Sequence, residues 1–357
     1  MVEVSRQVAT GAGVDFHIVM WIVFGAIIGI VLAIDLFVAH KDPHAVRIRE
    51  ALIWSGVWIA LACLFGGALA LMGGHGFGPD IALRYFAGYV IEKALSVDNL
   101  FVFAVIFAAL KIPREFQHKL LFWGVFGALI LRAVFVFAGV ALIEKFDWML
   151  YIFGAVLIFS ALKLLLQGDK EPEPEKGIVV RTLSRILPLK PENVGPNFTV
   201  RHDGKRYFTM LFIGLVLVEI TDVIFALDSV PAVIAVAMDP RTREVDSFIV
   251  YTSNAFAILG LRSLYFALAG IMAAFRFLKY GLSVILIFVG VKMMVIEFWH
   301  APLWLSLSVI GGVLLACVVL SLAIPAKVEL PEPKLLPGSA DAPEAEGPKP
   351  DGQESAG

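Results

Sequence analysis

Apolar residues run in long, nearly uninterrupted stretches along most of this chain. A helix needs about 20 predominantly apolar residues to cross the hydrocarbon core of a bilayer. Nine segments meet this requirement: residues 16–38, 51–72, 81–109, 118–143, 149–167, 207–237, 248–272, 280–298 and 303–324. The pattern predicts an all-α membrane protein with about nine transmembrane helices.

Two of these segments, 81–109 and 207–237, are longer than a straight crossing requires, and both contain acidic residues. The second also contains Pro231, which removes a hydrogen bond inside a helix. Broken or tilted helices are tolerated in membranes where the backbone lines a cavity or is buried in protein. We therefore expect these two segments to be broken or tilted. Breaks near Asp98 and near Pro231 would let the paired acids converge.

Three segments are not apolar enough to lie in the membrane. Residues 1–15 precede the first span as an external N-terminus, and residues 168–206 form a Pro- and Glu-containing cytoplasmic linker between two halves of the chain. Residues 325–357 are rich in Pro, Glu, Gly and Ala, and cannot bury enough apolar surface to fold. We expect this tail to be disordered and cytoplasmic.

Lysine and arginine in the loops predict the orientation. Counting the residues at span edges, 19 of them lie on one side of the membrane and 4 on the other. Cytoplasmic loops carry the excess of positive charge. The N-terminus is therefore expected outside the cell membrane and the C-terminus in the cytoplasm.

The amino-acid composition excludes several classes of protein function. Mean hydropathy is +0.85, 59% of the residues are hydrophobic and only 17% are charged, which excludes an ordinary soluble enzyme. The formal net charge of −2 gives no basic surface for nucleic acid. The two cysteines, Cys63 and Cys317, lie apart in apolar stretches, without the spacing of a metal finger or a disulfide framework.

The chain repeats itself at an offset of about 130 residues. The matched positions are Glu92, Asp98 and Asn99 with Asp222, Asp228 and Ser229; Arg132 with Arg262; and, at an offset of 129, Lys163 with Lys292. Residues 81–167 (repeat 1, spans 3–5) thus match residues 207–298 (repeat 2, spans 6–8), between two leading helices in 16–72 and a final helix at 303–324. Because each copy has three spans, the copies enter the membrane from opposite faces. This three-plus-three inverted repeat is typical of secondary transporters.

Several acidic residues lie where a bilayer makes charge costly. An ionisable group at the membrane centre costs about 2.5–3.5 kcal/mol, and six acids lie in or at the ends of the spans: Asp35, Glu92, Asp98, Glu219, Asp222 and Asp228. Any one of them could form a structural ion pair, and Asp35 near Lys41 favours that explanation. Concentration of the others on two repeat-related spans favours a functional site.

The potential ligands near these acids are oxygen donors. They include Ser96, Asn99, Thr221, Ser229 and Asn254, with no histidine or cysteine beside them. Such hard donors suit Mn²⁺, Mg²⁺ and Ca²⁺, whereas Zn²⁺ and Cu⁺ usually recruit nitrogen or sulfur. Carboxylates in a poorly hydrated cavity can also carry protons. A divalent cation moving against protons is the simplest interpretation.

Four cations recur with the acids: Arg132, Arg262, Lys163 and Lys292. Simple neutralisation of the acids is the favoured interpretation, and Lys93 is grouped with them. The alternative is that Arg132 and Arg262 are mobile counter-ions that occupy the acidic site when the metal leaves.

Three motifs resemble signatures of the TerC family of membrane proteins. They are Glu92-Lys-Ala-Leu-Ser-Val-Asp98-Asn99, Glu219-Ile-Thr-Asp222-Val-Ile-Phe-Ala-Leu-Asp228-Ser229-Val-Pro231, and Thr252-Ser-Asn254-Ala-Phe-Ala-Ile-Leu-Gly-Leu-Arg262-Ser-Leu-Tyr265. The nine-span layout is most similar to the family's Alx-like branch. The resemblance implies a membrane protein first associated with tellurite resistance and now with manganese efflux. It also implies that Glu92, Asp98, Asn99, Glu219, Asp222, Asp228 and Asn254 form the family's polar core.

The leading hypothesis is a secondary transporter, embedded in the lipid bilayer, that exports Mn²⁺ or a similar hard divalent cation and has no permanently bound cofactor. The alternative is a non-transporting scaffold that docks protein partners through the 168–206 linker, in metal or tellurite stress or in the metallation of secreted proteins. A membrane-embedded enzyme ranks last, because the sequence shows no nucleophile–base constellation, P-loop or HExxH motif.

Overall fold

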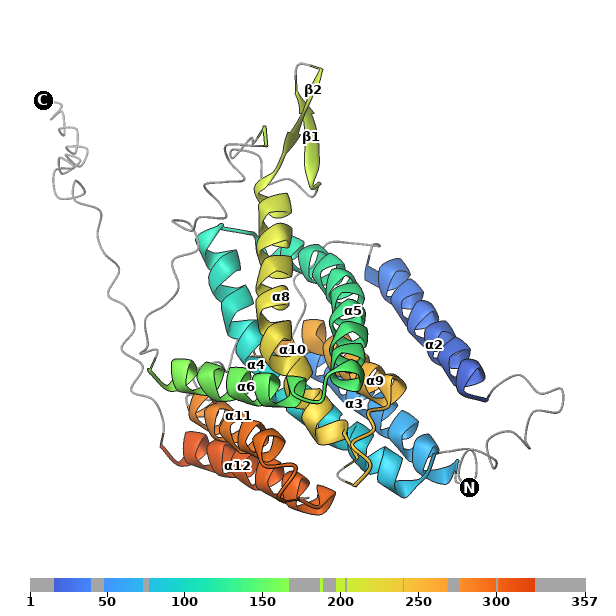
Figure 1. Cartoon of the computed structure of the whole chain (residues 1–357). Coiled ribbons are helices and arrows are strands. Elements are labelled where there is room, and N and C mark those ends of the chain that lie inside the picture. Colours follow the sequence, from blue (N-terminus) through green and yellow to red (C-terminus); the bar gives the residue numbers. More distant parts are fainter. Residues whose placement is uncertain are drawn as a thin grey trace, which may run out of the picture.

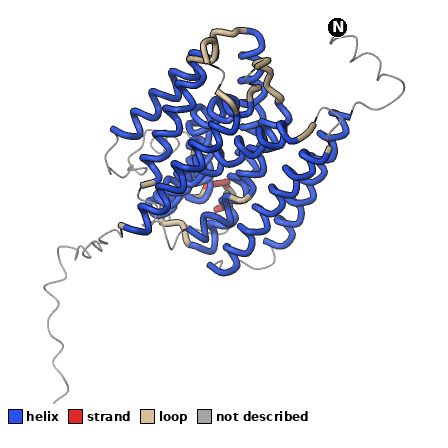
Figure 2. The backbone as a smooth tube through the Cα atoms, turned by 90° about the horizontal axis from the view of Figure 1, so that it is seen from below, coloured by secondary structure: helices blue, strands red, loops and turns tan. Residues whose placement is uncertain are grey.

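The computed structural model describes residues 16–39, 48–72, 77–166, 187–188, 197–202, 204–239, 241–268, 277–299 and 301–324, without the side chains of residues 35–39, 98, 202, 268 and 322. The predicted N-terminal segment, most of the linker and the predicted tail lie outside the described residues. The described part is almost wholly helical (Figures 1 and 2).

Helices occupy all the segments that the apolar pattern selected. They are α2 (Phe16–Ala39), α3 (Ile48–Leu71), α4 (Pro79–Ala109), α5 (Arg114–Lys145), α6 (Met149–Leu166), α8 (Met210–Ala237), α9 (Ser247–Leu259), α10 (Leu261–Leu268), α11 (Leu278–Met294) and α12 (Leu303–Ala323). Among the described helices, six are long and apolar enough to cross a membrane: α2, α3, α5, α6, α8 and α12. The chain is thus a mostly helical membrane protein, while the nine-span count and the inverted repeat stay predictions.

The predicted helix breaks near Asp98 and Pro231 are wrong. Helix α4 runs from Pro79 to Ala109 without interruption, and α8 continues through Pro231 to Ala237. Every residue of α8 from Ser229 to Ala237 is buried. Packing against neighbouring helices therefore holds α8 together although the proline removes one backbone hydrogen bond.

The chain breaks instead within the predicted span at 248–272. Helix α9 ends at Leu259, and α10 starts after Gly260. A Cβ atom at Gly260 would lie 2.7 Å from the Nζ atom of Lys93. The lysine side chain of α4 thus lies directly against the backbone at this break.

The C-terminal end of the segment predicted as a linker forms a β-hairpin. Strands β1 (Thr199–His202) and β2 (Lys205–Phe208) pair antiparallel, with His202 opposite Lys205. The intervening residues are Asp-Gly, a preferred sequence for two-residue hairpin turns, and Gly204 has a φ of 75°. The hairpin projects from the N-terminal end of α8 (Figure 1).

Four helices form the centre of the molecule. Helices α4 and α5 each pack against both α8 and α9. Helices α6 and α11 approach one another closely at two glycines, because a Cβ on Gly154 would lie 2.8 Å from the carbonyl oxygen of Gly290, and the reverse distance is the same. The bundle of α4, α5, α8 and α9 positions the site described next.

Candidate functional site

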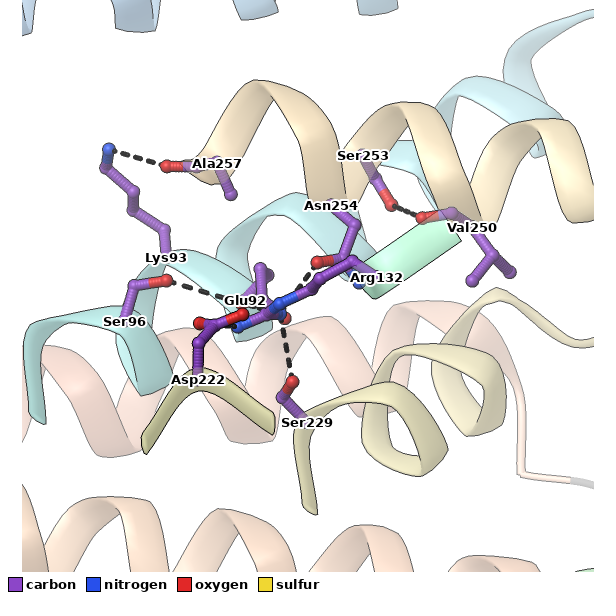
Figure 3. A network of polar contacts seen from close by, with 10 residues as sticks. All are labelled: Glu92, Lys93, Ser96, Arg132, Asp222, Ser229, Val250, Ser253, Asn254 and Ala257. Atoms are coloured by element: carbon purple, nitrogen blue, oxygen red, sulfur yellow. Dashed lines mark hydrogen bonds and ion pairs between the residues drawn. The ribbon is translucent and has the colours of Figure 1, made fainter. Parts of the chain in front are cut away.

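Arg132 of α5 is the centre of a buried polar network (Figure 3). Its guanidinium forms an ion pair with Glu92 of α4 and lies 3.4 Å from Asp222 Oδ1 of α8. The Nη1 atom donates to Ser229 Oγ of α8 at 2.9 Å and to Asn254 Oδ1 of α9 at 2.7 Å. The side chains of Arg132 and Glu92 are 0% exposed. One arginine therefore joins all four central helices.

Helical spacing explains why these side chains meet. On α4, Glu92, Ser96 and Asn99 follow one another at intervals of four and three residues, which places them on one face. All three are buried, and Ser96 Oγ donates to Glu92 Oε1 at 3.3 Å. On α8, Asp222 and Ser229 are seven residues apart, or about two turns. The polar face of α4 and the polar face of α8 are therefore both buried in the bundle.

Several polar atoms of this network have no hydrogen-bond partner among the described residues. They are one carboxylate oxygen each of Glu92 and Asp222, the amide nitrogens of Asn99 and Asn254, and Nε of Arg132. An unsatisfied buried polar atom costs about 1–3 kcal/mol. With two carboxylates and one guanidinium, the network carries a formal charge of −1. It can therefore accept a further cation or a hydrogen-bond donor.

Glu219 extends the network along α8. Its half-buried carboxylate packs against Gly127 of α5 so closely that a Cβ atom at Gly127 would collide with it. It lies near enough to Asp222, one turn further along, for the two charges to interact. One of its oxygens is buried without a hydrogen-bond partner in the described part. Thr221 differs from these groups because its hydroxyl donates to the carbonyl of Leu217 at 2.7 Å.

Asp228 contacts a different helix from Asp222. Its Oδ1 atom accepts a hydrogen bond from Ser160 Oγ of α6 at 2.6 Å, and Lys163 of α6 lies within electrostatic range. A break near Pro231 would have let Asp228 converge with Asp222. Because α8 is continuous, the two carboxylates point to different neighbours.

The other predicted cations are not around Arg132. Lys292 of α11 is buried and donates to the carbonyl of Ala235 at 3.4 Å, at the C-terminal end of α8. Arg262 is half-buried in the first turn of α10. Asp35 and Asp98 lie in α2 and α4, but their side chains lie outside the described residues. The roles predicted for these two acids stay predictions.

Lys93 has a contact that the sequence analysis missed. Its Nζ atom donates to the carbonyl of Ala257 at 3.3 Å, directly before the break between α9 and α10 (Figure 3). A helix end leaves its last carbonyls without intrahelical partners, and cations are favoured there. The glycine in the middle of an apolar span was the signal for this break. Ser160, the partner of Asp228, carried no comparable signal.

In the part of the chain that the structure describes, no three histidine, cysteine or acidic side chains are grouped to hold a metal ion. The positive charge between Glu92 and Asp222 is supplied by Arg132. A guanidinium and a divalent cation would compete for the same carboxylates. The arrangement is therefore one in which a single internal cation pairs with both acids and one negative charge is left over.

Comparison with known proteins gives a consistent assignment. Residues 77–329 match the profile of the integral membrane protein TerC family. This stretch contains the Arg132 network and the three motifs quoted above. The resemblance seen in the motifs is thereby confirmed.

Similar proteins are found in several bacteria. The chain is 48% identical over 303 residues to "Uncharacterized membrane protein STKORF319" of Myxococcus xanthus, covering 85% of this chain and 92% of that protein. It is 42% identical over 307 residues to "Putative membrane-bound redox modulator Alx" of Escherichia coli strain K12, covering 85% and 94%. No solved structure gives a significant match. The chain belongs to the TerC family of integral membrane proteins.

Proposed function

We propose that this protein transports a hard divalent cation, of which Mn²⁺ is the leading candidate, through the Arg132 network. The supporting observation is that Arg132 lies between Glu92 and Asp222 while each carboxylate keeps one buried oxygen without a partner. Charged groups buried in a membrane protein are costly and commonly mark ion pathways. Two acids from different helices that share one arginine side chain are suited to exchange one cation for another.

In this account Arg132 is a mobile counter-ion. A divalent cation would take the Glu92 and Asp222 carboxylates, with the side-chain oxygens of Ser229 and Asn254 as neutral donors. The guanidinium must then move away, because two adjacent cations repel strongly in a medium of low dielectric constant. When the metal leaves, Arg132 returns and keeps the carboxylates paired. Protons moving in the opposite direction are the candidate driving force.

The donor set supports selectivity for hard ions. All of the groups that face Arg132 offer oxygen, which suits Mn²⁺, Mg²⁺ and Ca²⁺. Cys63 lies exposed on α3, and Cys317 lies on α12 with its sulfur against Gly281 of α11. Neither sulfur is part of the network. Copper and zinc are therefore weaker candidates.

The name of the Alx relatives suggests a redox role, and direct redox chemistry would need electron-transferring groups in this chain. Both cysteines are free and lie on different helices in the described part. The geometry supports cation transport better. A redox effect in cells could still follow from a change in metal content.

The scaffold alternative has one observation in its favour. The β1–β2 hairpin exposes Arg201, Lys205 and Arg206, and Arg201 stands directly opposite Arg206. Like charges directly across a strand pair repel one another. An acidic partner at the predicted cytoplasmic end would relieve this repulsion.

Calorimetric titration of the purified protein with MnCl₂, MgCl₂, CaCl₂ and ZnCl₂ tests the proposal. Mn²⁺ should bind, and Asp222→Asn should weaken its binding at least about tenfold, a loss of ~1.4 kcal/mol. Glu297→Gln, which removes an exposed acid, is the matched control and should leave the affinity unchanged. Tighter binding of Zn²⁺ than of Mn²⁺, or equal affinities in wild type and Asp222→Asn, would contradict the assignment.

A further inference from the structure

Three polar contacts hold the loop between α8 and α9, described at residues 238–239 and 241–246, against other helices. Asp239 forms an ion pair with Arg84 of α4, and Asp246 lies 3.6 Å from His17 Nε2 of α2. Arg243 lies 3.9 Å from Glu297, just beyond α11. Of the three, only the Arg84–Asp239 pair has both side chains mostly buried, with 14% and 23% exposed.

Asp239 also organises the loop itself. Its Oδ1 atom accepts hydrogen bonds from the backbone N–H groups of Arg241 at 2.7 Å and Thr242 at 3.2 Å, while Oδ2 faces Arg84. Its own N–H donates to the carbonyl of Glu244 at 3.0 Å. The ion pair with α4 therefore fixes an already compact loop as one body.

Helix α4 carries both Arg84 of this ion pair and Glu92 of the Arg132 network. Arg84, Gly88 and Glu92 follow at intervals of four residues, so about 12 Å along the helix axis separates the loop contact from the buried acid. At Gly88 a Cβ atom would lie 2.7 Å from Ser253 Oγ of α9 and 3.0 Å from Val233 Cγ1 of α8. The three helices are thus in close contact between the loop and the network.

Buried side chains cover the Arg132 network at the end of the bundle next to the α8–α9 loop. Every residue of α8 from Ser229 to Ala237 is buried, and so are Met238, Val245 and Phe248. An ion that passed between the network and this end of α8 would have to cross that layer. The helix ends must therefore separate before the site can be reached from here.

We infer that Arg84 and Asp239 are positioning residues that hold this end of the bundle closed, and that their ion pair must open before the Arg132 network is accessible from the α8–α9 loop. The inference rests on the proposed transport function, because a closure matters only if an ion passes. Loop charges predict that this end faces the outside. The pair would accordingly govern the external step of the transport cycle.

Cysteine accessibility tests the closure without any measurement of flux. The parent is Val233→Cys in a Cys63→Ala/Cys317→Ala background, purified in detergent and labelled with a water-soluble maleimide. Val233 is 0% exposed and lies between the ion pair and the network. We expect Arg84→Gln and Asp239→Asn each to increase the labelling rate at least fivefold. The double variant should match the faster single variant, since both changes break one contact.

Two controls separate closure from general loosening of the structure. Arg241→Gln removes an exposed arginine side chain of the same loop and should stay within twofold of the parent, as should Arg84→Lys, which keeps the positive charge. Rates within twofold of the parent in both Arg84→Gln and Asp239→Asn would overturn the inference. So would multiplicative effects in the double variant, or labelling of Arg84→Lys as fast as Arg84→Gln. Absence of Mn²⁺ flux in wild-type proteoliposomes would refute the transport proposal instead, and it would leave the labelling rates unchanged.

Discussion

Arg132 and Glu92 form an ion pair between α5 and α4 at a position where neither side chain is exposed. Breaking a buried pair by removing one partner typically costs 3–5 kcal/mol, because the remaining charge loses its compensation. Arg132→Gln leaves both Glu92 and Asp222 without their cation. We expect its free energy of unfolding in detergent to fall by about 3–5 kcal/mol at neutral pH.

Addition of metal separates the counter-ion role of Arg132 from a purely structural role. If a divalent cation can replace the guanidinium, MnCl₂ should raise the melting temperature of Arg132→Gln more than that of the wild type. Arg132→Lys, which keeps a cation but loses the planar fork, should lie between the two proteins. Equal Mn²⁺-induced shifts in all three would mean that the metal does not bind at these carboxylates.

Asp228→Asn should affect binding and stability differently from Asp222→Asn. Asp228 accepts from Ser160 rather than from Arg132, and the amide oxygen of asparagine can accept the same hydrogen bond. We expect its stability to change by less than about 1 kcal/mol, since no buried arginine loses a partner. Mn²⁺ affinity should still fall at least severalfold if Asp228 lies on the ion path. Unchanged affinity in calorimetry would remove Asp228, and with it the predicted role of its repeat partner Asp98, from the metal site.

Replacing both cysteines should leave metal transport intact. Cys63 and Cys317 lie outside the Arg132 network and are both free. The Cys63→Ala/Cys317→Ala variant should therefore transport Mn²⁺ into proteoliposomes at a rate within about twofold of wild type, because hard oxygen sites do not depend on thiolates. Loss of flux from a variant with normal thermal stability would point to a thiol-dependent mechanism.

Acid should weaken the loop contact at Asp239. Burial alone would raise the pKa of Asp239, but the Arg241 N–H, the Arg84 side chain and the Thr242 N–H outweigh it and lower the pKa below its ordinary value. The ionised carboxylate therefore stabilises the fold above the ordinary aspartate pKa of about 3.9. This contribution is lost as the pH falls through the lower pKa of the folded state.

Asp239→Asn should accordingly melt at a lower temperature than wild type at pH 7, and the difference should shrink below about pH 4. Glu244→Gln removes an exposed acid from the same loop and is the control. Melting curves between pH 3 and pH 7 measure both variants. A difference that grows as the pH falls would have the wrong sign and would contradict the assigned ion pair.

The long apolar stretches of the sequence predicted the positions of the helices well. Each crossing of the bilayer core needs about 20 predominantly apolar residues. Spacing of three and four residues likewise placed Glu92, Ser96 and Asn99 on one buried face. These properties depend only on the local chain. The TerC assignment, which rests on contiguous motifs, is confirmed for the same reason.

Contacts between distant segments could not be derived in this way. Pro231 indicated a break, but burial of the surrounding turns keeps α8 continuous, and the break occurs at Gly260 where Lys93 approaches. Asp228 and Asp222 lie on one helix, yet Asp228 contacts Ser160 of α6. Asp222 contacts Arg132 of α5. In the sequence, Arg84 is a single charged residue near the start of a predicted span, and no motif marks it. Its role emerges only from the position of Asp239, 155 residues away.

The central claim is that a divalent cation crosses the membrane through the Glu92 and Asp222 carboxylates, which pair with Arg132. The most direct measurement is Mn²⁺ uptake into proteoliposomes containing wild-type protein, Asp222→Asn or the exposed-acid control Glu297→Gln, at equal reconstituted amounts. We predict saturable uptake by wild type and Glu297→Gln, and a reduction of at least about tenfold in Asp222→Asn, because the site loses one of its two facing carboxylate charges. Equal uptake by wild type and Asp222→Asn, or no uptake above protein-free liposomes by any of the three, would contradict the claim.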